Sequence, residues 1–294
     1  MRDTIRDPFN ALLGLEIESV TATGLTAYAE IPKEACNVFG AAHGGYVYSL
    51  GHVAAAQSAK LCLKRPAVVV NVTSQYLRSL IVSPAQVKTE LVRNGRELMI
   101  FRVEIRDGKG GLCFSQTVEL KEVAYPIPGE RTFSQTIVPG DENSPIDPVT
   151  DIYYPRLSPF FATPCHIHVL GRGDSGMIYG ADRYPETCNL YGAAHGGLIY
   201  TACDCAACGS MAFLMERKPV TVSSTIRYLR SAMVGPVKAE GKLVRDGKQL
   251  SYYDVEVTDG EDRLVAIAQF VLKSVDYQMT NDPGKEYHRK AFKD

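Results

Sequence analysis

The sequence predicts an α+β protein made of two similar halves, each a curved antiparallel sheet with one long helix on one face. Three observations support this prediction: a recurring motif, one long helical pattern after each copy, and four β-rich runs after each helix. Residues 37–45 read NVFGAAHGG and residues 189–197 read NLYGAAHGG, with seven of nine positions identical at an offset of 152. The same offset links Asp107-Gly108 to Asp259-Gly260, so both halves should share one fold.

The first elements of each half are read from the first copy. Leu15–Thr21 and Leu25–Ile31 are typical of a hairpin that turns at Ala22-Thr23-Gly24. Gly44–Leu63 is the only long helix candidate of its half, because its apolar residues recur at helical spacing; these are Val47, Leu50, Ala54 and Ala55. Alanine-rich helix middles would let the helix lie close to a sheet.

Four β-rich runs follow the helix and predict a meander. Asn94-Gly95 and Asp107-Gly108 indicate two-residue hairpin turns between them. The repeat is expected to slip by one residue near Gln116 and Gln269. The runs are Val68–Tyr76, Ala85–Arg93, Leu98–Arg106 and Leu112–Leu120.

Chain length and a stretch rich in proline and glycine divide the sequence into two domains. The 294 residues suit two domains of ordinary size. We expect a first domain at 1–121, a linker at 122–158, a second domain at 159–275 and a polar tail at 276–294. The linker is predicted from its density of residues that break helices and strands, namely Pro126, Pro128, Pro139, Pro145, Pro148, Pro155, Gly129 and Gly140.

Composition excludes several classes of partner. Apolar residues make up 45% and charged residues 22%, and the net charge is −1, so no global field favours nucleic acid or an anionic membrane. No run approaches 18 uninterrupted apolar residues, and the N-terminus lacks an apolar signal core. We therefore expect a cytoplasmic protein with reduced cysteines.

A cluster of cysteines could suggest a metal site, but Cys203-Asp204-Cys205-Ala206-Ala207-Cys208 lacks the second Cys or His pair of a zinc site, so no metal is predicted.

The Asn-x-x-Gly-x-x-His-Gly-Gly motif, the long helix and the four β-runs together resemble the hotdog-fold thioesterases. The nearest branch is that of the phenylacetate-pathway (PaaI-like) acyl-CoA thioesterases. The resemblance covers about 9–121 and 161–274 and implies two fused hotdog domains that form a dimer within one chain. It further implies hydrolysis of an acyl-CoA at a site shared by the repeats, no cofactor besides the coenzyme A of the substrate, and a homodimer of tandem chains.

The family places an acid on the helix, seven positions after the second glycine of the motif. That position is Asp204 in the second half but His52 in the first. A hydroxyl often lies seven positions before the strand tyrosine; Thr221 meets this in the second half, whereas the first half has Val69. The acid and the hydroxyl are therefore missing from the same half.

Helix geometry then predicts how the halves combine. Gly44 and residue 52, like Gly196 and Asp204, are eight positions apart, about 12 Å along one helix. One helix cannot easily present both groups to one carbonyl carbon, but two antiparallel helices side by side can. The predicted working site is Asn37, His43 and Gly44 with Asp204 and Thr221; the predicted degenerate site is Asn189, His195 and Gly196 with His52 and Val69.

Each residue of the working site has an expected role. The Gly44 N–H, at a helix start, would polarise the thioester oxygen. Asp204 would act as general base or attack directly, and partial burial would raise its pKa; a solvated helix residue is the plain alternative. Asn37 would position water or the carbonyl, Thr221 would orient the carboxylate or water, and His43 would shape the loop. His52 is expected to pack or to contact substrate.

Arg78, Arg96, Arg230 and Lys248 could bind coenzyme A phosphates, although cations at turns are commonplace. Tyr76 and Tyr228 are expected to be packed strand residues. Two other functions stay open: a non-catalytic acyl-CoA sensor, and an enoyl-CoA hydratase that pairs an acid with a histidine. The predicted pairing of the helices weakens the hydratase, because it puts Asp204 and His52 in different sites.

Overall fold

A computed structural model describes residues 3–4, 7–37, 39–123, 161–173 and 176–275. The first half contains β1 (Asp3–Thr4), α1 (Asn10–Leu13), β2 (Glu16–Val20), β3 (Leu25–Ala29), a 3-10 turn (Lys33–Ala35), α2 (Gly44–Cys62), β4 (Ala67–Tyr76), β5 (Ala85–Asn94), β6 (Leu98–Arg106) and β7 (Leu112–Glu122). The second contains β8 (Ile167–Arg172), β9 (Met177–Ala181), a 3-10 turn (Pro185–Thr187), α4 (Gly196–Met215), β10 (Pro219–Tyr228), β11 (Val237–Asp246), β12 (Leu250–Thr258) and β13 (Leu264–Ser274).

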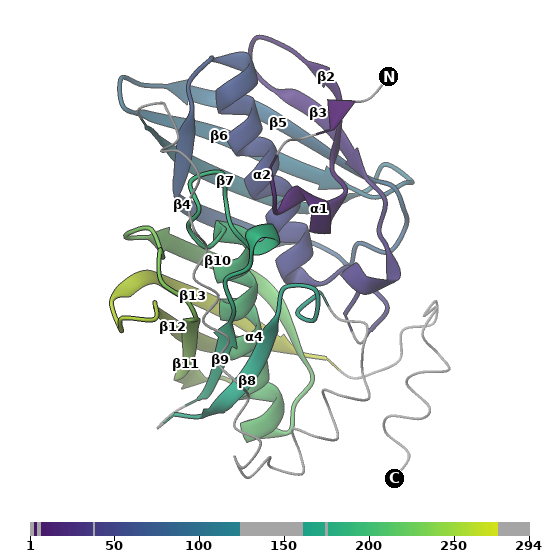
Figure 1. Cartoon of the computed structure of the whole chain (residues 1–294). Coiled ribbons are helices and arrows are strands. Elements are labelled where there is room, and N and C mark those ends of the chain that lie inside the picture. The colour runs from purple at the N-terminus through teal and green to yellow at the C-terminus, as the bar shows by residue number, and fades with distance from the viewer. Residues whose placement is uncertain (1–2, 5–6, 38, 124–160, 174–175, 276–294) are drawn as a thin grey trace.

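The described strands join in one sheet that runs through both halves (Figure 1). Their order is β1-β2-β3-β5-β6-β7-β4-β10-β13-β12-β11-β9-β8, and neighbours pair antiparallel. The halves meet where β4 pairs with β10, and Thr73 lies opposite Thr225. Because these two residues are themselves 152 apart, the approximate twofold axis that relates the halves passes between them.

The two halves repeat without insertion over most of their length. From the long helices to the last strand, every helix start and every strand boundary shifts by the same 152 residues. The predicted slip near Gln116 is therefore wrong, because Gln116 on β7 corresponds to Ala268 on β13 rather than to Gln269. The predicted hairpin, long helix and four strands of the first half are confirmed within two residues at each end; the short α1 was not predicted.

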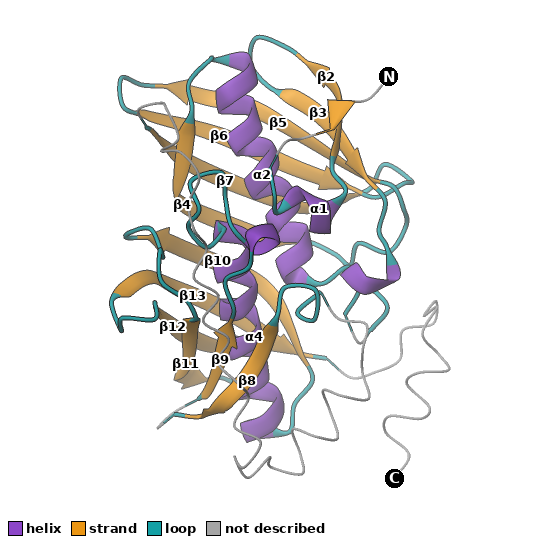
Figure 2. Cartoon of the chain, viewed as in Figure 1, coloured by secondary structure: helices purple, strands orange, loops and turns teal. Residues whose placement is uncertain are grey.

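Each long helix lies against the strands of its own half and also against the other helix (Figure 2). Most side chains of α2 and α4 are consequently buried, which is why neither helix has a strongly polar face. By length and composition alone α4 is apolar enough to cross a membrane, but most of it is buried inside the protein, as is usual for a core helix.

Both hairpin turns after β5 and β6 differ from the prediction. The first is centred on Arg96 and Glu97, two residues later than expected, with the Gly95 N–H donating to the Leu98 carbonyl at 2.9 Å. The second is a five-residue loop at 107–111, because the Asp107 side chain accepts the N–H groups of Lys109 and Gly111 and thereby replaces a tight turn.

The predicted domain boundaries lie mostly beyond what the structure describes. Strand β7 extends to Glu122, one residue past the predicted end of the first domain. Almost all of the predicted 122–158 linker and the predicted 276–294 tail lie outside the described residues, so these two assignments stay predictions.

Candidate active site

The motif loop positions the first residue of each long helix. Asn37 does this by accepting the N–H groups of Phe39 and Ala41 at 2.9 and 3.3 Å. His43 is the N-cap of α2, and its Nδ1 accepts the Gly45 N–H at 3.0 Å. Because Nδ1 accepts, neutral His43 carries its proton on Nε2, and burial lowers its pKa. His43 thus shapes the loop, as the sequence predicts.

The second half builds the same loop from equivalent residues. Asn189 accepts the N–H groups of Tyr191 and Ala193 at 2.9 and 3.2 Å. His195 caps α4 by accepting the Gly197 N–H at 2.9 Å. The two helix starts are therefore held alike, and any difference between the sites comes from what faces them.

The carboxylate of Asp204 faces the start of α2. A Cβ atom on residue 44 would lie only 2.7 Å from Asp204 Oδ2, so glycine is what allows the two helices to approach here. The predicted distant pair, Gly44 from one half and Asp204 from the other, is thus brought together. Among the described residues no acceptor is found for the Gly44 N–H, which as the first amide of a helix has none within α2.

Asp204 is held in one orientation by Thr221 on β10. The Thr221 hydroxyl donates to Asp204 Oδ1 at 2.7 Å, while the Cys208 thiol lies 3.9 Å from the same oxygen. Oδ2 remains on the side of Gly44, and His43 Nδ1 lies 3.9 Å from it, too far for a hydrogen bond. The carboxylate is therefore anchored through one oxygen and available through the other.

Burial dominates the electrostatics of Asp204. The residue is 4% exposed, and burial raises its pKa although His43 and the hydrogen bond from Thr221 act in the opposite direction. A buried carboxylate with a raised pKa is a stronger base than an exposed one.

Two tyrosines, one at the end of each central strand, fix the helix starts from the carbonyl side. Tyr76 donates its hydroxyl to the Gly44 carbonyl at 2.9 Å. Tyr228 does the same for Gly196 at 2.7 Å. Both are partly buried strand residues packed against the core, as predicted, but each also holds the glycine of the site, a role that the sequence reasoning missed.

The same tyrosines link the two halves. Tyr76 bonds Tyr200 of α4 through the two hydroxyls at 2.9 Å, and Tyr228 bonds Tyr48 of α2 at 2.8 Å. Tyr48 and Tyr200 stack face to face near the axis, with ring centres 3.6 Å apart. The relative position of the helices is therefore fixed close to both sites.

The second site has the same frame but different chemistry. His52 takes the place of Asp204: a Cβ on residue 196 would lie 2.3 Å from His52 Cε1. Val69 takes the place of Thr221. His52 is buried, burial beside His195 keeps its pKa well below the ordinary value, and its Nδ1 has no hydrogen-bond partner among the described residues.

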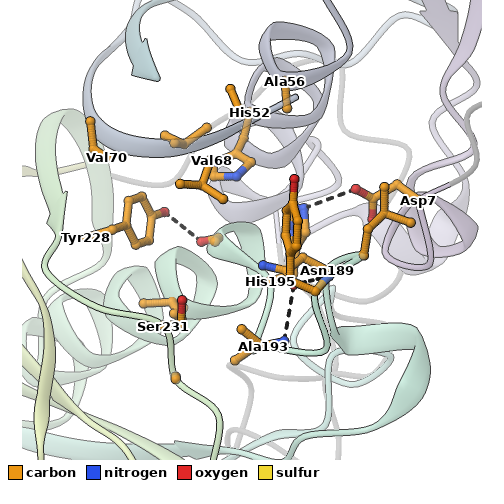
Figure 3. A pocket seen from close by; sticks show the side chains of 18 of the residues that line it. Asp7, His52, Ala56, Val68, Val70, Asn189, Ala193, His195, Tyr228 and Ser231 are labelled. Carbon is orange, nitrogen blue, oxygen red and sulfur yellow. Dashed lines mark hydrogen bonds and ion pairs between the residues drawn. The ribbon is translucent and has the colours of Figure 1, made fainter. Parts of the chain in front are cut away.

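A cavity of about 220 Å³ lies at this second site (Figure 3). We call it the His52 pocket. Figure 3 shows His52, Asp7 and His195 around it. Its lining includes Asp7, His52, Ala56, Lys60, Val68, Val69, Val70, Asn189, His195, Gly196, Tyr228 and Arg230.

Asp7 is a residue of this pocket that the sequence reasoning missed. Its Oδ2 lies 3.9 Å from His195 Nε2, and its Oδ1 accepts the Phe9 N–H at 3.0 Å. Burial raises the pKa of Asp7 to about 6, partly opposed by that hydrogen bond and by Lys60. The repeat offset gives Pro159 as its counterpart. The sequence signal that could have pointed to Asp7 is therefore an acidic residue in one half with no acidic counterpart in the other.

The four predicted cations do not gather at one site. Arg230 lines the His52 pocket. Arg78 lies 3.7 Å from Asp107 and bonds the Leu112 carbonyl. Arg96 and Lys248 lie in exposed turns. Among the described residues, no group of three or more His, Cys, Asp or Glu side chains is arranged to hold a metal.

Fold and site together define a tandem hotdog protein in which each site combines residues of both halves. Sequence comparison adds the family. Residues 191–266 match the family model described as thioesterase superfamily, and residues 32–120 match the one described as acyl-CoA thioesterase N-terminal domain. The chain belongs to the thioesterase superfamily, and its two halves form a tandem of hotdog domains.

Individual relatives agree with this assignment. A protein of Saccharolobus solfataricus whose description is that of an esterase is 32% identical over 78 residues, which span 26% of this chain and 52% of that protein. The match thus covers only about half of that relative.

Three solved structures share the whole fold. The TesB protein of Mycobacterium avium subspecies paratuberculosis has a TM-score of 0.63 at 12% identity, with 91% of this chain and 98% of that chain covered. Acyl-CoA thioesterase II of Mycobacterium marinum has a TM-score of 0.61 at 14% identity, with 93% of this chain and 100% of that chain covered. A hotdog-fold protein of Alicyclobacillus acidocaldarius has a TM-score of 0.64 at 14% identity, with the same coverage of the two chains. The predicted tandem hotdog fold is confirmed.

Proposed function

We propose that this chain hydrolyses an acyl-CoA thioester at the site formed by Gly44 and Asp204. The observation that carries the proposal is the contact across the halves: a buried carboxylate, anchored by Thr221, faces a helix-start amide without an acceptor among the described residues. The family assignment of both halves supports it.

The reaction follows from these positions. The thioester oxygen would accept the Gly44 N–H, where the helix dipole stabilises the oxyanion that forms on attack. Oδ2 of Asp204 would take a proton from water as that water attacks the carbonyl carbon, and the protonated carboxyl would return the proton to the departing thiolate. Oδ1 stays bonded to Thr221 throughout.

Asn37 has a narrower role than the sequence suggests. Its Oδ1 is already used by the loop, so only its NH₂ group could bond the water or the carbonyl oxygen. Asn37→Asp keeps an acceptor for the loop but removes this donor. It should therefore lower kcat while leaving the melting temperature nearly unchanged.

The test is release of free thiol from a panel of acyl-CoAs by wild type and by Asp204→Asn. Asparagine keeps the size of the side chain and can still accept from Thr221, but it cannot take a proton. We expect kcat to fall by about 10²-fold or more. Unchanged turnover in the variant would refute the proposed base, and tight binding without any wild-type turnover would favour the sensor.

We further propose that the protein is cytoplasmic, works as a homodimer of tandem chains and needs no cofactor beyond its substrate. The near-neutral charge supports the cytoplasmic location; the arrangement of the family supports the homodimer and the lack of a cofactor. Membership of the PaaI-like branch is likewise a proposal, supported by the motif. Cell fractionation and sedimentation in solution test location and assembly, and turnover after dialysis against a chelator tests the absence of a metal.

A further inference from the structure

We propose that the His52 pocket binds the carboxylate of a small organic acid, the chemical class that thioester hydrolysis releases. The link to a product rests on the proposed function; the preference for a carboxylate rests on the pocket itself. Its volume of about 220 Å³ is below the ~300–1,000 Å³ of pockets for drug-sized ligands. It therefore suits a short acid rather than a whole acyl-CoA.

The first argument is the neutral group at the helix start. In the working site Asp204 places a negative charge against Gly44, which would repel an acid. In the His52 pocket a neutral imidazole occupies that position against Gly196. The Gly196 N–H has no acceptor among the described residues, and the start of α4 favours an anion.

The second argument is that His52 itself has an unmet polar atom. His52 is buried, with only 7% of the residue exposed, and its Nδ1 has no hydrogen-bond partner among the described residues. A buried polar atom without a partner is costly unless a ligand or water supplies one. A carboxylate beside the imidazole would provide an acceptor and would favour the protonated ring.

The third argument is that Arg230 is available to the pocket because the aspartate near it is bonded by another arginine. In the first half Asp107 lies 3.7 Å from Arg78. In the second half the equivalent Asp259 is bonded instead by Arg263, at 2.7 and 2.9 Å. Position 263 corresponds to Gly111, so the first half has no such competitor. Arg230, the counterpart of Arg78, is thereby left to line the pocket.

The fourth argument concerns the remaining charges of the lining. Lys60 lies two turns beyond His52 on α2, where α4 has the neutral Ala212. Asp7 opposes both cations, but burial raises its pKa to about 6. Once Asp7 is protonated, every formal charge on the described lining residues is positive, because burial keeps His195 neutral with a pKa lowered to about 3 and Tyr228 is neutral as well. Acid binding should therefore strengthen as the pH falls towards 6.

The experiment is calorimetric titration of the full-length protein with hexanoate at pH 5.5 and pH 8. Wild type should bind more tightly at pH 5.5. Arg230→Gln, an exposed change that leaves the core intact, should weaken binding about three- to fivefold. His52→Asp places a carboxylate where the acid would lie and should weaken it about tenfold or more. The matched variant Arg78→Gln, at the same position of the first half, should weaken it less than about twofold.

The outcomes separate this inference from the proposed function. Binding that is insensitive to Arg230→Gln or to His52→Asp, or that Arg78→Gln alone weakens, overturns the inference. Thiol release by wild type is measured in parallel. Thiol release without Arg230-dependent binding defeats the inference alone, whereas Arg230-dependent binding without thiol release supports the acid site and defeats the proposed function.

Discussion

The residues at position 204 and its counterpart 52 decide what each site can do. Both are buried beside a helix-start glycine within nearly identical frames. Only the carboxylate of Asp204 can accept a proton from water near neutral pH, because burial keeps the imidazole of His52 a weak base. A chain with two similar sites should therefore show one catalytic centre.

The direction of the pKa shift of Asp204 can be tested by kinetics. The ionised carboxylate is the base, so kcat/KM should rise with pH through the pKa of Asp204 in the free enzyme. Since burial raises that pKa above its ordinary value of 3.8, the midpoint should lie above pH 3.8. A profile that is flat from pH 4 to 8 in wild type would contradict this assignment.

Thr221 acts on the reaction through Asp204, so it is a positioning residue. Its hydrogen bond lowers the pKa of Asp204; Thr221→Val should therefore move the rising limb of the pH profile to higher pH and lower kcat about tenfold. Thr221→Ser restores the hydroxyl and should recover both. A fall in kcat without a shift in the profile would indicate a packing defect instead.

Much of the site could be predicted from the sequence, for a geometrical reason. The rise of a helix separates Gly44 from position 52 by about 12 Å, which requires the partner group to come from the other helix, and the repeat supplies one. Asp7 could not be found in this way. It belongs to the N-terminal segment, has no acidic counterpart, and reaches the pocket only because α1 and the preceding turn pack Phe9 onto His195.

At the scale of elements, the two long helices are located by hydrogen bonds to strands that sequence patterns could not reveal. Period-two alternation predicts that Tyr76 and Tyr228 face inward but does not say which carbonyl each hydroxyl meets. Likewise, Asn-Gly and Asp-Gly predicted turns between the correct strands but not their exact form: the first turn is centred two residues later, and side-chain capping by Asp107 widens the second into a loop.

The tyrosine bonds give a matched pair of variants. Tyr76→Phe frees the Gly44 carbonyl at the working site, and Tyr228→Phe frees the Gly196 carbonyl at the other. Each removes two hydrogen bonds of one hydroxyl, so both should lower the free energy of unfolding by about 1–3 kcal/mol. Tyr76→Phe should lower kcat more than Tyr228→Phe. Equal losses of kcat would show that neither hydroxyl has a local effect.

At the scale of the whole molecule, Asp7 links stability to pH. Its pKa is about 6 in the folded protein and about 4 in an unfolded chain, so the folded state binds more protons between these values. Stability should accordingly fall as the pH rises from about 4 to 6. Asp7→Asn removes this cost: it should raise the free energy of unfolding by about 1–3 kcal/mol at pH 7.5.

Near pH 3 the carboxyl is protonated in both states, so the same substitution should change stability little there. Urea denaturation at the two pH values measures the difference. An equal gain at both would show that the effect comes from packing rather than from charge.

The pairing of β4 with β10 has a consequence for how this protein can associate. An open strand edge is a template on which another chain can add. In isolated halves, β4 and β10 would each be an exposed edge strand. In this chain the two strands pair with each other in the middle of the sheet. Among the described strands, further copies that associate through backbone pairing would have to use the two ends of the sheet, β1 and β8, which are only two and six residues long. Any stable higher assembly should therefore rely on side-chain surfaces.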